Sequence, residues 1–335
     1  MRLLKYLCLG ALVWGLYWGL AAWALRSGLE SWFDAQARQG WQVSHGQLST
    51  AGFPLRHRTR IDQPLLADPG TGAAWSADWL ALDSPAIWPG ALTLSFPETQ
   101  QRFSVFDQSS ALTAQDMTAE MQLAPGAALT LERLELQAQV WKILQQQATM
   151  PQWQAQDLEL ILHQQSAQPT QYDLRMAITG FAPGGAFRRI SQLANDLPKQ
   201  FDALQLQGAI DFDTPWDRRA LEQRRPQPRQ ITLDLAEAKW GEMRFKASGQ
   251  LQMDDQGRAT GDLALQVRNW RAILDMAERS SLLPPQTRTA IERVLALFSS
   301  PAGQGERINT TLRFQQGQMW IGPLPIGTAP PIRLR

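Results

Sequence analysis

The chain has 335 residues, 44% of them hydrophobic, and its 32 Lys and Arg residues nearly balance 31 Asp and Glu. The near-zero net charge argues against a nucleic-acid binder, which carries a basic excess on one face, and the length suffices for one large or two medium domains. Three His and one Cys leave little material for metal or thiol chemistry, and no disulfide can form within the chain because Cys8 is its only cysteine.

Residues 6–25 form an uncharged, mostly apolar run that follows Arg2 and Lys5. As a helix this run is about 30 Å long, the thickness of a bilayer core. A cleaved signal peptide is the alternative, since Ala22-Trp23-Ala24 has the small-x-small form of a cleavage site. Because the run is long and contains bulky aromatic residues, we predict an uncleaved anchor over residues 1–26. The short tail before it places the body, residues 27–335, in the periplasm of a Gram-negative cell, with the anchor in the inner membrane.

Residues 27–40 predict a short separate helix, which Ser27 caps and Gly40 ends. The stretch Gly52-Phe53-Pro54-Leu55-Arg56 then interrupts extended chain. Pro54 lacks a backbone N–H and Gly52 permits an unusual backbone angle, so we expect a bend here, with Phe53 filling its corner. Beyond the bend His57, Thr59 and Ile61 share one face of a strand, whereas Arg56, Arg58 and Arg60 form a solvated basic stripe on the other.

From here the dominant pattern has period two, with apolar residues alternating with Gln, Glu, Asp, Arg and Thr. It is typical of antiparallel strands with one apolar and one wet face, and it recurs at 129–140, 158–162, 174–178, 204–212 and 231–235. The clearest hairpin is 243–268, which turns at Asp254-Asp255-Gln256-Gly257.

Helical periodicity of 3.6 residues appears at 186–201, 270–280 and 285–298. The proline-broken, basic segment 213–230 is typical of a connection and suggests a joint between two sub-halves of the body. We therefore predict a β-dominated α+β fold, in which an N-terminal transmembrane helix precedes a long curved antiparallel sheet packed with a few amphipathic helices.

Candidate chemical groups are few. His45, His57 and His163 lack the spacing of a zinc site, so we predict no metal and no cofactor. Asp211 and Asp213 share one strand face as a glycosidase pair would, but solvated strand-end residues explain them better. In the absence of a nucleophile–base arrangement, we do not expect an enzyme.

The strongest charge cluster lies in the segment 213–230. It is a candidate contact for anionic headgroups or an acidic partner, but a soluble linker explains it better. The cluster consists of Arg218, Arg219, Arg224, Arg225 and Arg229.

Gly52-Phe53-Pro54-Leu55-Arg56, placed after an N-terminal anchor, resembles the Gly-Phe/Tyr-Pro-x-Arg hallmark of the alphaproteobacterial domain-of-unknown-function family 2125 (DUF2125). Segments 257–270 and 315–332 resemble the closing segments of that family. The resemblance implies an envelope protein and supplies no catalytic residues; we interpret Gly52, Phe53, Pro54 and Arg56 as architectural. The closing pattern is also similar, more loosely, to AsmA-like proteins, which are inner-membrane-anchored, periplasmic, β-rich proteins associated with lipid transport.

The function predicted from these features is a non-catalytic one. The alternating apolar face and the 14 Trp residues favour a protein that binds a phospholipid, an acyl chain or another hydrophobic ligand and serves envelope homeostasis. The alternative is a structural or assembly factor that binds another envelope protein by strand addition or through its basic segment. The shape of the sheet, either closed around a core or open as an apolar groove, distinguishes them best.

Overall fold

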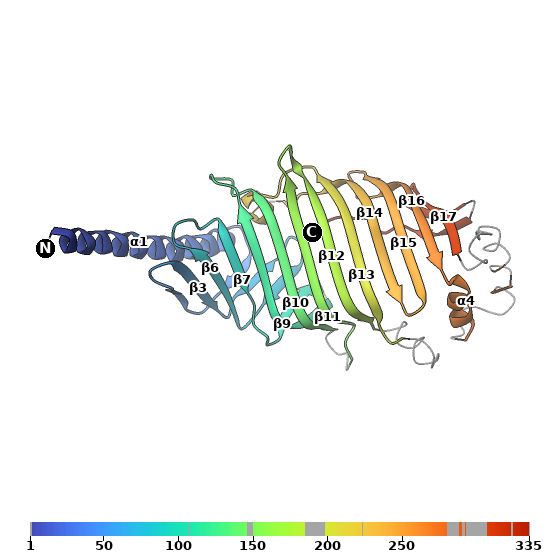
Figure 1. Ribbon diagram of the computed structural model, residues 1–335, viewed down its shortest axis with the longest axis horizontal. Coiled ribbons are helices and arrows are strands. Elements are labelled where there is room, and N and C mark those ends of the chain that lie inside the picture. Colours follow the sequence, from blue (N-terminus) through green and yellow to red (C-terminus); the bar gives the residue numbers. More distant parts are fainter. Residues whose placement is uncertain are drawn as a thin grey trace. The chain divides into compact units, whose positions relative to one another are not determined.

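The computed structural model describes residues 2–106, 108–145, 150–184, 198–222, 224–279, 288–289, 292, 307–322 and 324–334. The fold is β-dominated, with 57% strand, one long N-terminal apolar helix, few other helices and an antiparallel sheet that is not closed (Figure 1). This confirms the predicted fold class.

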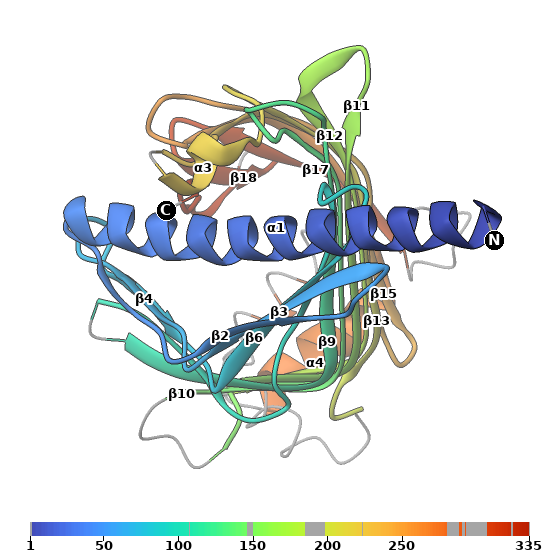
Figure 2. The ribbon, with the colours of Figure 1, turned by 90° about the vertical axis from the view of Figure 1, so that its left-hand side faces the viewer.

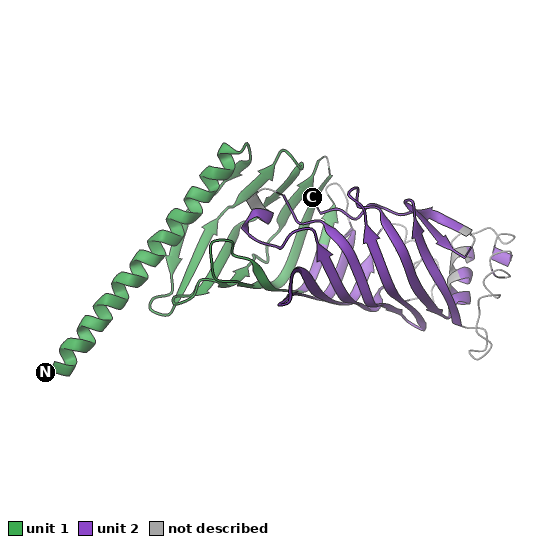
Figure 3. Cartoon of the chain, turned by 90° about the horizontal axis from the view of Figure 1, so that it is seen from above, with its two compact units in different colours: residues 1–138, 143–148 green, residues 139–142, 149–335 purple. Residues whose placement is uncertain are grey.

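The chain divides into two compact units (Figure 3). Unit 1 comprises residues 1–138 and 143–148, and unit 2 comprises residues 139–142 and 149–335. The segment 213–230, where the sequence suggested a joint between two sub-halves, lies within unit 2, where it connects two strands that pair with each other and includes the first residues of the second strand.

A single helix, α1 (Arg2–Arg38), replaces the predicted anchor and the separate helix after it. It passes through Ser27 without a break, so Ser27 caps nothing. The helix ends as predicted at Gly40, whose φ of 94° is a left-handed conformation. The Trp41 N–H donates to the Gln36 carbonyl and the Gly40 N–H to the Ala37 carbonyl, which is the Schellman arrangement that satisfies the last free carbonyls of a helix.

The part of α1 after the apolar run lies against unit 1, beside β1 and β2 (Figure 2). Ala22, Phe33 and Gln36 are the buried residues of the helix, and Phe33 contacts the His45 ring with the two centroids 4.5 Å apart. These contacts explain the continuity at Ser27, because they hold both sides of that residue on one straight helix.

The sheet of unit 1 consists of two antiparallel ladders that meet at one long strand. Its short strands are β1 (Gln42–Ser44), β2 (Leu48–Ala51), β3 (Arg56–Asp62), β4 (Leu65–Asp68), β5 (Ala73–Ser76), β6 (Trp79–Pro85), β7 (Ala91–Ser95) and β8 (Gln101–Val105), and the long strands are β9 (Gln108–Leu123) and β10 (Leu131–Gln145). One ladder runs β1–β4–β5–β8 and the other β2–β3–β6–β7. Residues 108–112 of β9 pair with β8 and residues 118–122 with β7.

Unit 2 contains a meander in which each strand pairs with the next. Its strands are β11 (Trp153–Gln165), β12 (Gln168–Pro183), β13 (Phe201–Phe212), β14 (Pro228–Trp240), β15 (Met243–Met253), β16 (Ala259–Arg268), β17 (Arg307–Gln315), β18 (Gln318–Ile321) and β19 (Leu324–Thr328). The long members of this meander, β11 to β16, lie side by side in Figure 1. Figure 2, in which the ribbon is turned by 90° about the vertical axis, shows that these strands curve along their length.

Two short helices belong to unit 2, α3 (Arg218–Glu222) and α4 (Trp270–Arg279). The helix α4 confirms the prediction at 270–280. The helix predicted at 285–298 lies largely outside the described residues, as does most of that predicted at 186–201, whose last residue begins β13. The predicted 243–268 hairpin is confirmed as β15 and β16, in which Met253 pairs with Ala259 across the turn.

Candidate functional site

The most extensive candidate site is an apolar face on the sheet of unit 2. Because each strand from β11 to β17 pairs with the next, apolar residues of neighbouring strands lie side by side in rows across the sheet, with shifts of register at β14. The central row consists of Leu160, Met176, Leu206, Ala236, Ala247, Leu265 and Thr310. One flanking row consists of Leu158, Ile178, Leu204, Ala238, Phe245, Val267 and Ile308, and the other of Leu162, Leu174, Gly208, Leu233, Gly249, Leu263 and Leu312. These three rows are the apolar face.

The described residues cover this apolar face only in part. Trp270 and Leu274 of α4 bury Ile308 at one place, and Ile332 of the C-terminal tail packs on the cluster around Leu263 at another. By contrast, every residue of the central row remains partly exposed. In a two-layer domain the centre of an apolar sheet face is the best-buried part, so the apolar face behaves as an open surface along its middle.

The central row is long enough to hold an extended hydrocarbon chain. Seven neighbouring strands are separated by six intervals of about 4.8 Å, so the row measures roughly 29 Å. This length is comparable to the hydrocarbon thickness of a whole bilayer, which two opposed acyl chains fill. A single acyl chain therefore fits along the row.

Two glycines, Gly249 of the apolar face on β15 and Gly261 on β16, allow these neighbouring strands to approach closely. Gly249 and Gly261 have φ angles of 148° and 144°, and a Cβ at either position would collide with a backbone carbonyl oxygen of the paired strand, that of Asp262 or Gln250. A side chain at these positions is therefore excluded twice, by the backbone angle and by the neighbouring strand.

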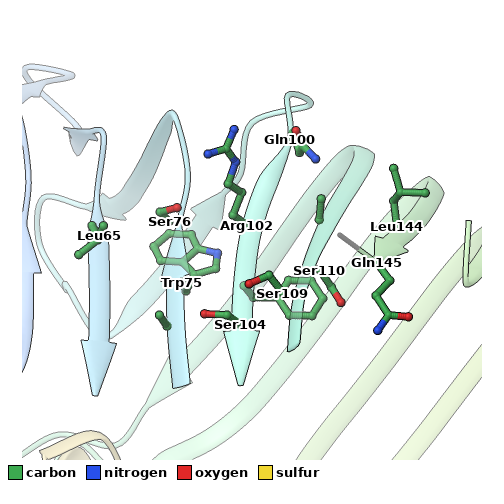
Figure 4. Close-up of a pocket in the computed structure, with 13 residues that line it drawn as sticks. Leu65, Trp75, Ser76, Gln100, Arg102, Ser104, Ser109, Ser110, Leu144 and Gln145 are labelled. Atoms are coloured by element: carbon green, nitrogen blue, oxygen red, sulfur yellow. The ribbon is translucent and has the colours of Figure 1, made fainter. Parts of the chain in front are cut away.

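Unit 1 contains a separate cavity of about 560 Å³ (Figure 4). Its lining combines apolar and polar side chains and includes one charged residue, Arg102; the lining residues are Leu65, Ala74, Trp75, Ser76, Gln100, Arg102, Phe103, Ser104, Ser109, Ser110, Ala111, Leu144 and Gln145. The Trp75 indole N–H donates to the Gln101 side-chain oxygen. A cavity with aromatic walls and several hydroxyl groups suits an amphipathic ligand.

The predicted bend at Gly52–Arg56 is confirmed. Gly52 has a φ of 106°, the Phe53–Pro54 peptide bond is cis, and the Arg56 N–H donates to the Gly52 carbonyl. Beyond the bend His57, Thr59 and Ile61 are buried, whereas the arginines of β3 are exposed, as predicted. The expectation for Phe53 is wrong: its ring meets Trp18 edge-on but is largely exposed, because α1 covers only one side of the bend.

Contacts with α1 are what hold this bend. The indole N–H of Trp18 donates to the Arg56 carbonyl over 2.9 Å and that of Trp14 donates to the Pro54 carbonyl over 3.0 Å. The Trp18 ring also stacks on His57, with the two centroids 5.0 Å apart. Sequence reasoning missed these contacts, since 38 or more residues separate the partners and no local periodicity connects them.

Three of the five arginines in the proposed anionic-contact set form ion pairs with carboxylates of unit 2. Arg219 pairs with Asp217 over 2.6 Å and Arg224 with Asp213 over 2.8 Å, while Arg229 pairs with Asp255. Burial raises the pKa of the Asp213 carboxyl, but hydrogen bonds from the Gln227 amide and the Arg224 guanidinium outweigh it and hold the pKa below its usual value. Arg219, Arg224 and Arg229 are thus paired within the protein itself, and this geometry does not require an anionic partner for them.

The remaining candidate residues lie apart from one another. His57 is buried beside α1 and His163 is exposed on β11, and the described residues contain no group of three His, Cys, Asp or Glu that could hold a metal ion. Asp211 accepts a hydrogen bond from Thr170 and Asp213 pairs with Arg224, so each carboxylate is engaged separately. The Asp254 carboxylate accepts the Gln256 and Arg258 N–H groups and so stabilises the β15–β16 turn.

The fold and these surfaces define a class of protein: a large open antiparallel sheet with an accessible apolar face, joined to a single N-terminal apolar helix that could anchor it in a membrane. The chain belongs to the family described as "Uncharacterized protein conserved in bacteria (DUF2125)", whose model matches residues 18–330. This match confirms the resemblance found on the Gly-Phe-Pro stretch. The curated proteins contain no match to the chain.

Proposed function

We propose that this protein is a non-catalytic, inner-membrane-anchored periplasmic protein that holds a lipid acyl chain on the apolar face of unit 2 and serves homeostasis of the cell envelope. The observation that carries the proposal is the partial exposure of the whole central row, from Leu160 to Thr310. A continuous row of partly exposed, mostly apolar side chains supports a surface that an apolar ligand completes.

An acyl chain is the ligand whose shape and chemistry match this row. It is linear and apolar, and each methylene that it buries contributes about 0.8 kcal/mol. The polar faces of the same strands carry Gln and charged residues, which suits a sheet exposed to water on its other side. The pattern likeness to AsmA-like proteins, which are associated with lipid transport, points in the same direction. No catalytic group is needed for this function.

Photo-crosslinking within the full chain tests the proposal. Benzoylphenylalanine replaces Leu206 of the central row in one variant, and the adjacent Gln207, which is exposed on the opposite face of β13, in a control variant. After irradiation in Gram-negative cells, mass spectrometry of the purified chain identifies the adducts. We expect lipid adducts at position 206 and none at position 207.

The same experiment addresses the alternative function, a structural or assembly factor. A reproducible adduct between position 206 and another envelope protein, without lipid adducts, would contradict lipid binding and favour that alternative. Equal lipid adducts at both positions would indicate non-specific contact with the membrane and would also count against the proposal.

A further inference from the structure

Two neighbouring loops of unit 1 expose large apolar side chains. On the first, the bend between β2 and β3, Phe53 is 58% exposed and Leu55 is 71% exposed. On the second, between β6 and β7, Ile87 is 77% exposed and Trp88 is 41% exposed. The Ala86 N–H donates to the Leu55 carbonyl over 2.8 Å and joins the loops. These four side chains are the apolar tip.

The apolar tip lies beside α1 within its apolar run. Besides the two tryptophan contacts with the first loop, the Tyr17 hydroxyl donates to the Ala86 carbonyl of the second loop over 2.8 Å. The side chains of the helix around this level, such as Leu16 and Leu20, are exposed. The three residues that make these contacts, Trp14, Tyr17 and Trp18, lie within the apolar run 6–25 of α1.

Several backbone carbonyls of the two loops have hydrogen-bond partners within the protein. Hydrocarbon offers no hydrogen bonds, so an unpaired carbonyl there costs several kcal/mol. Here α1 supplies donors to the Pro54, Arg56 and Ala86 carbonyls. The Leu55 carbonyl accepts from Ala86, and Pro54 itself has no N–H. These carbonyls therefore need no water to satisfy them.

An ion pair limits how deeply this region can enter a bilayer. The Arg56 guanidinium lies 2.6 Å from the Asp83 carboxylate, and such a pair belongs at the level of the headgroups, with only the apolar stem of Arg56 reaching deeper. The apolar run of α1 covers residues 6–25, and a helix rises about 1.5 Å per residue. Trp18 therefore lies roughly 10 Å below the end of the run, in the acyl region of the leaflet on the side of the body.

We propose that the apolar tip inserts into the membrane leaflet on the side of the body, so that unit 1 is held at the bilayer by α1 and by these two loops together. Phe53, Leu55, Ile87 and Trp88 reach the upper acyl region, and Arg56 and Asp83 lie among the headgroups. The inference rests on the proposed role of α1 as a membrane anchor, and the occupant of this surface is the same bilayer that α1 crosses.

Depth measurement in nanodiscs tests the inference. In the full chain carrying Cys8→Ala, a single cysteine is introduced at Leu55 or Ile87 and labelled with an environment-sensitive fluorophore. Phe106→Cys is the matched control, since Phe106 is 66% exposed on a different loop of unit 1. Leu12→Cys, on the exposed apolar surface of α1, reports on the anchor itself. Each label is challenged with phosphatidylcholine brominated on its acyl chains and with aqueous iodide.

Labels at Leu55 and Ile87 should lose fluorescence to the brominated lipid and resist iodide, whereas the label at Phe106 should do the reverse. If Leu55 and Ile87 behave like Phe106 while Leu12 is quenched by the lipid, the anchor stands and the inserted loops are refuted. If Leu12 also escapes the brominated lipid, the anchor assignment fails, and the inference fails with it.

Discussion

The contact between Trp18 and the bend gives the most specific prediction, because a substitution can remove its hydrogen-bond donor while most of the packing of the side chain is kept. Trp18→Phe keeps an aromatic ring near His57 and Phe53 but removes the indole N–H that donates to the Arg56 carbonyl. In a bilayer, where the proposed insertion keeps water from the Arg56 carbonyl, loss of this donor costs about 1–3 kcal/mol. The local opening free energy of the bend should fall by that amount.

Hydrogen–deuterium exchange of the full chain in nanodiscs measures this effect. The reporting amides are those of Arg56 and Ala86, whose N–H groups are bonded to the Gly52 and Leu55 carbonyls. A loss of about 1–3 kcal/mol should accelerate their exchange about 5- to 150-fold, provided that exchange follows local opening. In detergent-free water, where a solvent molecule can replace the indole, the acceleration should be smaller.

The control is Trp23→Phe, because Trp23 lies on the same helix but is largely exposed. Exchange of the bend should not change in this variant. The reasoning is refuted if Trp18→Phe leaves the Arg56 and Ala86 amides at their wild-type rates, or if Trp23→Phe accelerates them equally.

Three further predictions concern unit 2. The folded-state pKa of Asp213 is lowered. Its contribution to stability is therefore present above its unfolded pKa and is lost as the pH falls through the folded value. The difference in unfolding free energy between wild type and Asp213→Asn, measured by urea unfolding, should shrink below about pH 4. Gly249→Ala should lower the unfolding free energy by more than about 1 kcal/mol, since an alanine at this φ meets the carbonyl of the paired strand; an unchanged melting temperature would contradict this. Leu263→Ala, at a buried position, should cost about 2–5 kcal/mol, whereas Leu206→Ala in the partly exposed central row should cost clearly less in lipid-free protein. Equal losses in these two variants would mean that the central row is an ordinary core.

The strands of unit 2 could be predicted because their signal is local. Alternation of apolar and polar side chains requires only that one face of each strand avoids water, and β15 with β16 follows the pattern closely. The β-bulge in β14 was not predictable in the same way. The alternation of apolar residues continues from Leu233 to Leu235, but the pairing with β15 shifts between Leu233 and Ala236. Contacts with the neighbouring strands determine where the extra residues of the bulge lie.

The sequence predicted which residues form the apolar face, but not which of them remain accessible. The alternation identifies Leu206 and Leu251 equally as inward residues, yet Leu251 is buried in a cluster to which Ile332 contributes and Leu206 remains accessible. Their difference depends on a segment far along the chain. The basic segment shows the same limit, since the carboxylate partners of Arg224 and Arg229 come from elsewhere in unit 2.

The sequence by itself determined the apolar N-terminal helix, the β-dominated body and the bend at Gly52–Arg56, because helix propensity, two-residue alternation and the backbone restrictions of Gly and Pro act between near neighbours. Only the tertiary structure decided that the helix continues through Ser27, that its tryptophans hold the bend, and that the central row of the apolar face stays open. These features arise from contacts between segments that lie far apart in the chain, and burial is a property of the assembled sheet rather than of any one strand.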